Sequence, residues 1–289
     1  YCTGDLHVGS NETTYYDIQG TPVTVKHHGF DNFLAVREWI KNHYSSDANG
    51  KMAKIENLLV TGSSAGGYGA TLNFPYLQET FPKSNAVLFA DASAATVTQG
   101  FLDTVFSAEN NWNSGDTLPT IFAEELGLFT VAELIDGEYQ EGFNKQLITK
   151  LTDAYPRNRF AQYTTARDFV QVQFLKIMTL IDEGDANPWN WDLNLDFDGP
   201  DHDYFVSWNL QMEASFFSIA ENTDNYQSFI GADIYPFSEN VGFHMVLIDA
   251  FAPPNIFYTE SAEGVYFTDW LDSFVNDKKF NEENLMYSN

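Results

Sequence analysis

Residues 61–70 read TGSSAGGYGA and follow the short apolar run NLLV at 57–60. The apolar run predicts a buried strand, and the residues after the turn predict a helix. A strand, a tight glycine-rich turn and a helix are the context of a nucleophile elbow, and GSSAG within the turn matches the G-x-S-x-G pattern. Side chains two residues before and after Ser64 would block such a turn, so Gly62 and Gly66 should both be required. Ser64 is therefore the candidate nucleophile; the alternative is a Gly/Ser-rich turn with only a packing role.

The rest of the chain alternates short apolar strands with amphipathic helices. Strands are predicted at 21–28, 58–61, 86–90, 160–164 and 226–230, and helices at 65–78, 169–178 and 270–275. A further helix should follow Asp31-Asn32 as its cap and bury one face made of Phe33, Val36, Trp39 and Ile40. Alternation of this kind predicts an α/β fold, with a mostly parallel sheet covered by helices on both faces.

Two stretches break the alternation, at about 100–156 and 182–222. Because ligands of parallel sheets bind outside the carboxyl ends of the strands, we expect both stretches to be cap insertions over that edge. They would belong to a single domain that spans residues 1–289. The alternative is a pair of surface insertions with no role in substrate binding.

The composition limits the classes of function. Of the 289 residues, 44% are hydrophobic, and 41 acidic side chains against 14 basic ones give a formal net charge of −27. This balance excludes a general nucleic-acid-binding role, which needs clustered Lys and Arg for phosphate contacts. It predicts a solvated acidic surface on a salt-tolerant monomer. No run of about 18 apolar residues occurs, so no membrane span is expected, and the single cysteine, Cys2, allows no intramolecular disulfide.

A nucleophilic serine needs a base that takes its proton and an acid that orients the base, and on this architecture the chain order is Ser, Asp or Glu, then His. Of the six histidines, only His202 and His244 follow Ser64. His202 lies in a polar loop, where a solvated histidine is the ordinary outcome. His244 lies between the last predicted strand and the last predicted helix, which favours it as the base. The alternative for His244 is a histidine packed among its apolar neighbours.

Several aspartates are candidates for the acid. Asp168 stands after a predicted strand and just before an amphipathic helix, which places it at the same sheet edge as the serine. Asp91 also follows a strand, but it comes directly after the nucleophile unit, where a structural cap is the usual role. Asp182, Asp185 and Asp233 lie in predicted loops. The pattern alone favours Asp168 and leaves the others open.

Metal and cofactor motifs are missing from the sequence. No H-x-x-x-H or H-E-x-x-H pair, no dinucleotide-binding glycine motif and no P-loop occur, so we expect neither a metal site nor a cofactor. The acidic loop 192–203, DLNLDFDGPDHD, has the composition of a calcium loop but not its spacing. Bound calcium at this loop is left open.

Ordered motifs give the chain a resemblance to a known family. YCTGD at 1–5, followed by His7 and Gly9, resembles the Y-C-[ST]-[GS]-D segment of pectin acetylesterases and Notum-type carboxylesterases. GSSAGG at 62–67 is similar to the nucleophile segment of that family. DFVQ at 168–171 matches its D-x-x-Q acid segment, at a spacing from the serine that is typical of the family.

The resemblance continues in the carboxyl-terminal part. His244, followed by FYT at 257–259, GV at 264–265 and WL at 270–271, resembles the corresponding segment of the bacterial members. The motifs therefore cover nearly the whole chain in the family's order.

The resemblance implies an α/β-hydrolase fold and a serine carboxylesterase with the triad Ser64, Asp168 and His244. It implies that the N–H of Ala65 is one oxyanion donor. It also implies removal of O-acyl groups, chiefly acetyl groups of a polysaccharide, by a secreted or periplasmic protein.

The chain departs from the family pattern in three respects. The Gly-Gly-Gly-Trp-type oxyanion loop belongs to an amino-terminal part without a counterpart in residues 1–289, and the second oxyanion donor stays open. The numerous cysteines of the eukaryotic members are missing, and the stretch 232–243 resembles an insertion. Two alternatives therefore remain: a noncatalytic glycan-binding protein on a hydrolase scaffold, and a lipid or polyester hydrolase with the same triad.

Overall fold

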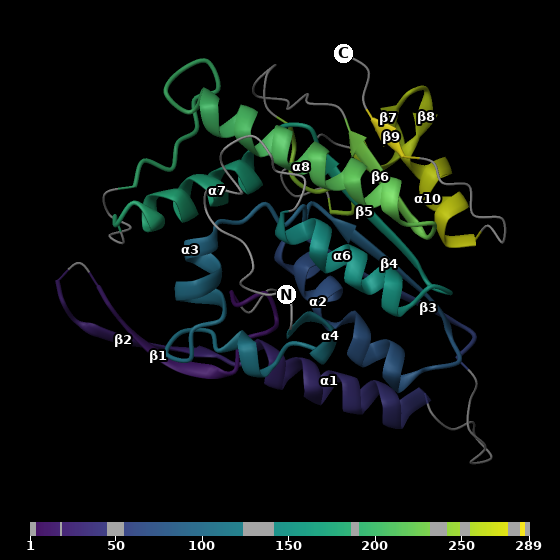
Figure 1. Cartoon of the computed structure of the whole chain (residues 1–289), viewed down its shortest axis with the longest axis horizontal. Coiled ribbons are helices and arrows are strands. Elements are labelled where there is room, and N and C mark those ends of the chain that lie inside the picture. The colour runs from purple at the N-terminus through teal and green to yellow at the C-terminus, as the bar shows by residue number, and fades with distance from the viewer. Residues whose placement is uncertain are drawn as a thin grey trace.

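The computed structural model describes residues 4–17, 19–44, 55–123, 142–185, 191–231, 242–248, 255–276 and 284–286. At its centre lies a five-stranded sheet in the order β3 (Asn57–Ser63), β4 (Asn85–Asp91), β5 (Arg159–Thr165), β6 (Tyr226–Gly231) and β9 (Leu285–Met286). Each strand runs parallel to its neighbours, and helices flank the sheet (Figure 1). The expected α/β class is confirmed as a mixed fold with a central parallel sheet.

The strands are connected through helices. The long ones are α2 (Ala65–Thr80) after β3, α6 (Phe143–Ala154) before β5, α7 (Phe169–Asp182) and α8 (His202–Asn222) between β5 and β6, and α10 (Phe267–Asn276) after β6. The other elements are β1 (Asn11–Tyr16), β2 (Pro22–His27), α1 (Gly29–Tyr44), α3 (Gln99–Phe101), the π-helical turn η1 (Leu102–Phe106), the 3₁₀ turn η2 (Ser114–Asp116), α4 (Thr120–Ala123), α9 (Ile256–Thr259), β7 (Ser261–Ala262) and β8 (Val265–Tyr266).

The sheet is buried on both faces because successive side chains of its strands point to opposite sides. On β4, Ala86 and Leu88 belong to the apolar cluster that contains side chains of α2 and α6. Val87 and Phe89, one position further along each time, pack with side chains of α10 instead. Both faces therefore carry a helical layer, as central strands of parallel sheets require.

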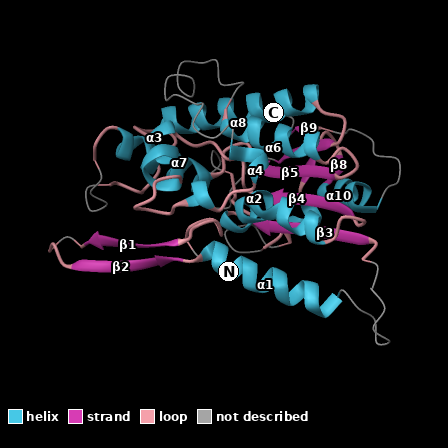
Figure 2. Ribbon diagram, turned by 60° about the horizontal axis from the view of Figure 1, so that its bottom comes forward, coloured by secondary structure: helices cyan, strands magenta, loops and turns pink. Residues whose placement is uncertain are grey.

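The amino-terminal elements differ from expectation. The strand predicted at 21–28 forms as β2, but it pairs antiparallel with β1 in a separate hairpin, which projects from the body of the molecule (Figure 2). Helix α1 begins at Gly29, and its expected apolar face is only partly buried, since Val36 and Trp39 are 55% and 59% exposed. The helix lies along the margin of the molecule (Figure 1). The indole of Trp39 stacks on His43, with ring centroids 4.9 Å apart, instead of entering the core.

The two expected cap stretches lie only partly beyond the sheet. α3, α7 and the first turns of α8 extend past the carboxyl ends of the strands (Figure 2). In contrast, α6 and the end of α8 flank the sheet, because Ile148, Leu151 and Ile219 are fully buried in the cluster shared with β4 and β5. Apolar side chains on one face of a helix need a surface to pack against, and the sheet provides it. The cap role of the two stretches stays a prediction, and 124–141 lies outside the described residues.

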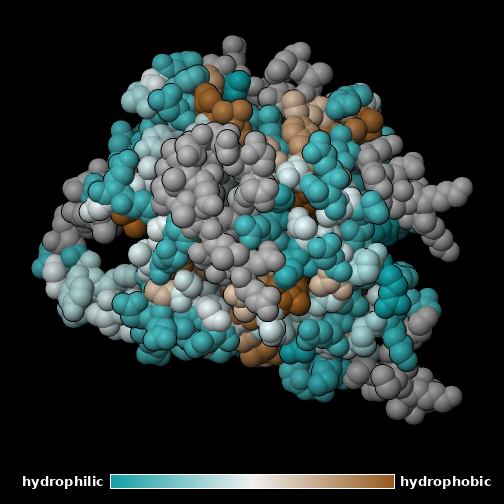
Figure 3. All heavy atoms as spheres, in the orientation of Figure 1, coloured by the Kyte–Doolittle hydropathy of each residue, from teal (hydrophilic) through white to brown (hydrophobic). Residues whose placement is uncertain are grey.

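The surface seen in Figure 3 is mainly hydrophilic, with small apolar areas separated by polar residues. The exposed large apolar side chains include Val206 and Leu210 on α8, which are 42% and 51% exposed. Within the described ranges, no helix combines the length and the apolar character needed to cross a bilayer.

Candidate active site

The turn between β3 and α2 is tight, and Ser64 at its centre has a strained backbone. Ser64 lies between the last residue of the strand and the first residue of the helix, with φ 55° and ψ −127°. A non-glycine residue in this region is strained by about 1–3 kcal/mol and is held only by its surroundings. Here the Ser64 N–H donates to Asp91 O (2.8 Å), and Ser64 O accepts from the N–H of Gly67 (2.8 Å). The predicted strand, turn and helix are thus confirmed, with Ser64 at the carboxyl end of β3.

The glycines of the turn have different roles. A side-chain carbon on Gly62 would collide with the carbonyl of Gly66, so the expectation for Gly62 is confirmed. The expectation for Gly66 is wrong, because a side-chain carbon there would meet no atom within 4 Å. Gly67 is the crowded position instead, since a side-chain carbon on it would collide with Ser93 Oγ. Position 62 therefore requires glycine because the backbone of Gly66 lies close to it. Position 67 requires glycine because Ser93 lies close to α2 there.

Asp168 and His244 are in direct contact. Asp168 lies three residues after β5 and caps α7, where its Oδ1 accepts from the N–H groups of Val170 and Gln171 (3.0 Å each). The other carboxylate oxygen, Oδ2, lies 2.8 Å from His244 Nδ1. Both residues are buried, with exposures of 0% and 3%. The structure therefore brings together two of the three predicted residues, which lie 76 positions apart in the chain.

Gln171 also fixes the carboxylate of Asp168. Its side-chain Nε2 donates to Asp168 Oδ2 (2.8 Å) and to Thr164 Oγ1 (3.0 Å). Its Oε1 accepts from the N–H of Ala94 (2.8 Å) and from the hydroxyl of Tyr68 on α2 (3.2 Å). Sequence reasoning did not assign this role. The sequence does carry a signal for it, because a glutamine stands three positions after the capping aspartate, which is the spacing of a capping box.

The short segment 242–248 carries His244. Gly242 N–H donates to Arg167 O (2.8 Å), and Thr165 Oγ1 donates to Phe243 O (2.7 Å). A side-chain carbon on Gly242 would collide with Thr165. The end of β5 and the residues after it therefore fix the histidine segment beside the acid.

Asp91, which was expected to be a structural cap, caps no described helix. It is the last residue of β4 and is fully buried. Its carboxylate accepts from Ser63 Oγ (2.6 Å) and from the N–H groups of Val246 and Leu247 (3.1 Å each). Asp91 thus joins the residue before the candidate nucleophile to the segment that carries His244.

The surroundings of His244 favour its protonated form. Burial lowers the pKa of the imidazole, but the charge and hydrogen bond of Asp168 and the charge of Asp91 outweigh this effect, so the pKa lies above its usual 6.5. Because a carboxylate faces Nδ1, the neutral ring carries its proton there and leaves the lone pair on Nε2. Among the described residues, the buried Nε2 atom has no hydrogen-bond partner.

The third predicted residue, Ser64, lies at the same edge without a hydrogen bond to His244. Its connection to the pair runs through Asp91 Oδ2, which accepts from both Ser63 Oγ and Leu247 N–H. Catalytic hydrogen bonds are often long before substrate binds. Ala65 is the first residue of α2, so its N–H points out of the helix end and can donate to an oxyanion.

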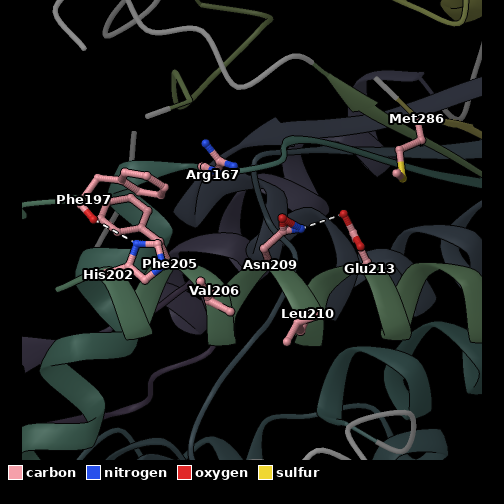
Figure 4. Close-up of a pocket in the computed structure, with 9 residues that line it drawn as sticks. All are labelled: Arg167, Phe197, His202, Phe205, Val206, Asn209, Leu210, Glu213 and Met286. Carbon is pink, nitrogen blue, oxygen red and sulfur yellow. Dashed lines mark hydrogen bonds between the residues drawn. The ribbon is translucent and has the colours of Figure 1, made fainter. Parts of the chain in front are cut away.

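The remaining candidates lie elsewhere. His202 begins α8, and its Nδ1 lies 3.0 Å from Phe197 O. It lines a pocket of about 290 Å³ together with Arg167, Phe205 and Glu213 (Figure 4), and none of Ser64, Asp168 and His244 lines that pocket. No group of three or more His, Cys, Asp or Glu that could hold a metal ion occurs in the described ranges, which include loop 192–203.

Comparison of the chain with models of protein families, with curated proteins and with solved structures found no match. The protein is a mixed α/β protein whose parallel sheet carries a strained serine turn and a buried Asp–His pair at one edge.

Proposed function

We propose that this protein is a serine carboxylesterase that removes O-acyl groups, with acetyl esters of a polysaccharide as its substrate class. One observation carries the proposal: the buried Asp168 carboxylate holds Nδ1 of His244 at 2.8 Å, at the sheet edge where Ser64 occupies a strained elbow. The three residues follow the chain order Ser, Asp, His that serine hydrolases on parallel sheets use.

The chemistry follows from the positions of these groups. His244 Nε2 takes the proton of Ser64 Oγ as the oxygen attacks the ester carbonyl, and Asp168 stabilises the imidazolium that forms. The Ala65 N–H donates to the oxyanion of the tetrahedral intermediate. The imidazolium then gives its proton to the leaving alcohol, which leaves an acyl-serine. Water, deprotonated by His244, attacks this ester and releases the carboxylic acid and free Ser64.

The choice of acetyl as the acyl group and of a polysaccharide as the substrate rests on the resemblance to pectin acetylesterases. The net charge of −27 adds a physical constraint, because an anionic protein repels a polyanion. A polymer whose carboxylates are largely esterified, or one that is uncharged, fits this surface better than a free polyuronate.

The test combines turnover with active-site labelling. p-Nitrophenyl esters of acetate and of longer acids are hydrolysed, and a fluorophosphonate probe is located by peptide mapping. We expect labelling at Ser64, fastest turnover of the acetate ester, and loss of both signals in Ser64→Ala and His244→Ala. His202→Ala is the matched control, because this histidine also follows Ser64 in the chain but lines the separate pocket; it should keep full activity.

The other outcomes separate the alternatives. Labelling at Ser64 with a preference for long acyl chains would retain the triad and move the substrate to lipids or polyesters. If the probe labels no residue and no ester is hydrolysed, the proposal that the protein is an esterase is contradicted. Glycan binding by that inactive protein would then support a noncatalytic binding protein.

A further inference from the structure

A single carboxylate connects the turn that carries Ser64 with the segment that carries His244. Asp91 Oδ2 accepts from Ser63 Oγ at 2.6 Å and from Leu247 N–H at 3.1 Å, and Oδ1 accepts from Val246 N–H at 3.1 Å. Ser63 directly precedes the candidate nucleophile, and Val246 follows His244 by two residues. Asp91 lies 155 positions before Val246 in the chain, and it is fully buried.

We propose that Asp91 is a positioning residue whose ionised carboxylate holds the His244 segment against the Ser64 turn and whose charge favours the imidazolium of His244. The inference rests on the proposed function, because it concerns the same serine and histidine. It assigns to Asp91 an action through His244 rather than a contact with substrate.

The ionised state is the one that fits the three donors. A carboxylate accepts at both oxygens, whereas a protonated acid turns one oxygen into a donor and loses part of that capacity. Hydrogen bonds to a carboxylate are also about twice as strong as those to a neutral acceptor. The tie between the two segments therefore weakens when Asp91 takes up a proton.

Burial and the titratable groups around Asp91 determine the pH at which its carboxylate takes up a proton. Burial raises the pKa of its carboxyl to about 6, although the hydrogen bond from Ser63, those from Val246 and Leu247, and the charge of His244 act to lower it. Tyr163 also interacts with Asp91; burial and the charge of Glu260 raise the pKa of this phenol, so it stays neutral.

The remaining charged group is Asp168, whose Oδ2 lies 2.8 Å from His244 Nδ1. Its charge and that of Asp91 both raise the pKa of His244. Removing the charge of Asp91 should therefore lower the pKa of His244, while Asp168 still holds the ring.

The experiment compares Asp91→Asn with wild type. Asparagine keeps the shape but removes the charge and sets an NH₂ group against donors. We expect kcat for p-nitrophenyl acetate to fall by about tenfold to a hundredfold with little change in KM, because a small misplacement of a catalytic group costs about this much. In a ¹⁵N-histidine NMR titration, the pKa of His244 should fall below its wild-type value.

The matched control is Asp201→Asn. Asp201 is also a buried carboxylate, and it accepts from Lys176 Nζ (2.6 Å) and from the N–H of Asp196 (3.0 Å). The loss of its charge should reduce stability but leave the pKa of His244 unchanged. The inference is overturned if Asp91→Asn keeps wild-type kcat and a wild-type His244 titration, or if Asp201→Asn shifts that titration equally.

A second variant serves if Asp91→Asn does not fold. Ser63→Ala keeps the carboxylate and its charge but removes one of its three hydrogen bonds, so kcat should fall while the pKa of His244 stays at its wild-type value. An unchanged kcat would overturn the inference. If wild type neither hydrolyses esters nor reacts with fluorophosphonate, the proposed function fails, and the His244 titrations still decide whether the charge of Asp91 acts on this ring.

Discussion

At the scale of single residues, the site is a chain of buried polar groups, each oriented by the next. Tyr68 and the Ala94 N–H fix the amide of Gln171, Gln171 fixes Asp168, and Asp168 fixes His244. Buried polar groups without partners are costly, so each of these contacts restricts the rotamer of its neighbour. The orientation of His244 is therefore a property of the network.

The first prediction concerns pH. His244 must be neutral to accept the proton of Ser64, and its pKa lies above 6.5 because the charges of Asp168 and Asp91 outweigh burial. Activity should be low at acid pH and rise through a midpoint above 6.5 in kcat/KM profiles. Asp168→Asn should lower kcat by about 10³–10⁴-fold, since the ring loses its tautomer and its charge partner. A wild-type midpoint well below 6.5 would contradict this assignment of the base.

A second prediction isolates Gln171. Gln171→Ala removes two donors and an acceptor and leaves the Ala94 N–H buried without its partner. We expect a loss of about 1–3 kcal/mol in the free energy of unfolding and a fall of about tenfold or more in kcat, because Asp168 is no longer fixed. Gln173→Ala, two positions further on the same helix and half-buried, is the control, because the amide of Gln173 donates to Leu193 O and not to Asp168. Equal effects of the two substitutions on kcat would argue against the network.

At the scale of elements, the site depends on very tight packing between β3, the start of α2 and the loop after β4. The elbow brings the start of α2 so close to β3 that Gly62 has no room for a side chain, and Ser93 presses on Gly67. The loop after β4 contributes to the same packing, because Ser93 Oγ also donates to Ser64 O (3.1 Å). The strain at Ser64 is thus held by neighbours on both sides.

This packing predicts opposite effects of two alanines. Gly67→Ala collides with Ser93 and should destabilise the protein by about 1–3 kcal/mol, the usual cost of overpacking. Gly66→Ala meets open space at a helix start and should change stability by less, with a gain of up to about 1 kcal/mol because alanine restricts the unfolded chain. Urea unfolding of both variants measures the difference. A larger loss for Gly66→Ala would contradict the geometry of the turn.

The assignment of α6 to the sheet layer gives a further prediction. Leu151 is fully buried in the cluster shared with β4 and β5. Leu151→Ala should cost about 2–5 kcal/mol in the free energy of unfolding, whereas Leu210→Ala on the exposed side of α8 should stay within about 0.5 kcal/mol. Small and equal losses would instead fit a helix that lies over the sheet edge without joining the core.

At the scale of the whole molecule, three adjacent parallel strands bring Ser64, Asp91 and Asp168 to one edge of the sheet. Ser64 follows β3, Asp91 ends β4 and Asp168 follows β5, which are adjacent strands in the sheet. Their carboxyl ends meet at one rim, where ligands of such sheets bind. The surface around this rim belongs to a strongly acidic chain, with 41 acidic and 14 basic residues.

The charge predicts the response to salt. Repulsion among unbalanced carboxylates destabilises the compact state, and salt screens it over about 8–10 Å. The free energy of unfolding should therefore rise when sodium chloride is added from low ionic strength, and esterase activity should persist. An equal osmolality of sucrose is the control, because sucrose is excluded from the protein surface but does not screen charge. A fall in stability or a collapse of activity with added salt would contradict the prediction.

The sequence alone determined the alternation of strands and helices, the elbow at Ser64 and the order of the candidate residues. These are local properties: β3 and β4 contain apolar runs, and the glycine pattern of a tight turn lies within ten residues. The tertiary structure alone decided that Asp91 joins two distant segments, that Gln171 holds Asp168, and that α6 and the end of α8 flank the sheet. It also decided that Val36 and Trp39 stay exposed. Such contacts depend on which segments meet in space, and composition and periodicity carry no information about partners 76 or 155 positions away.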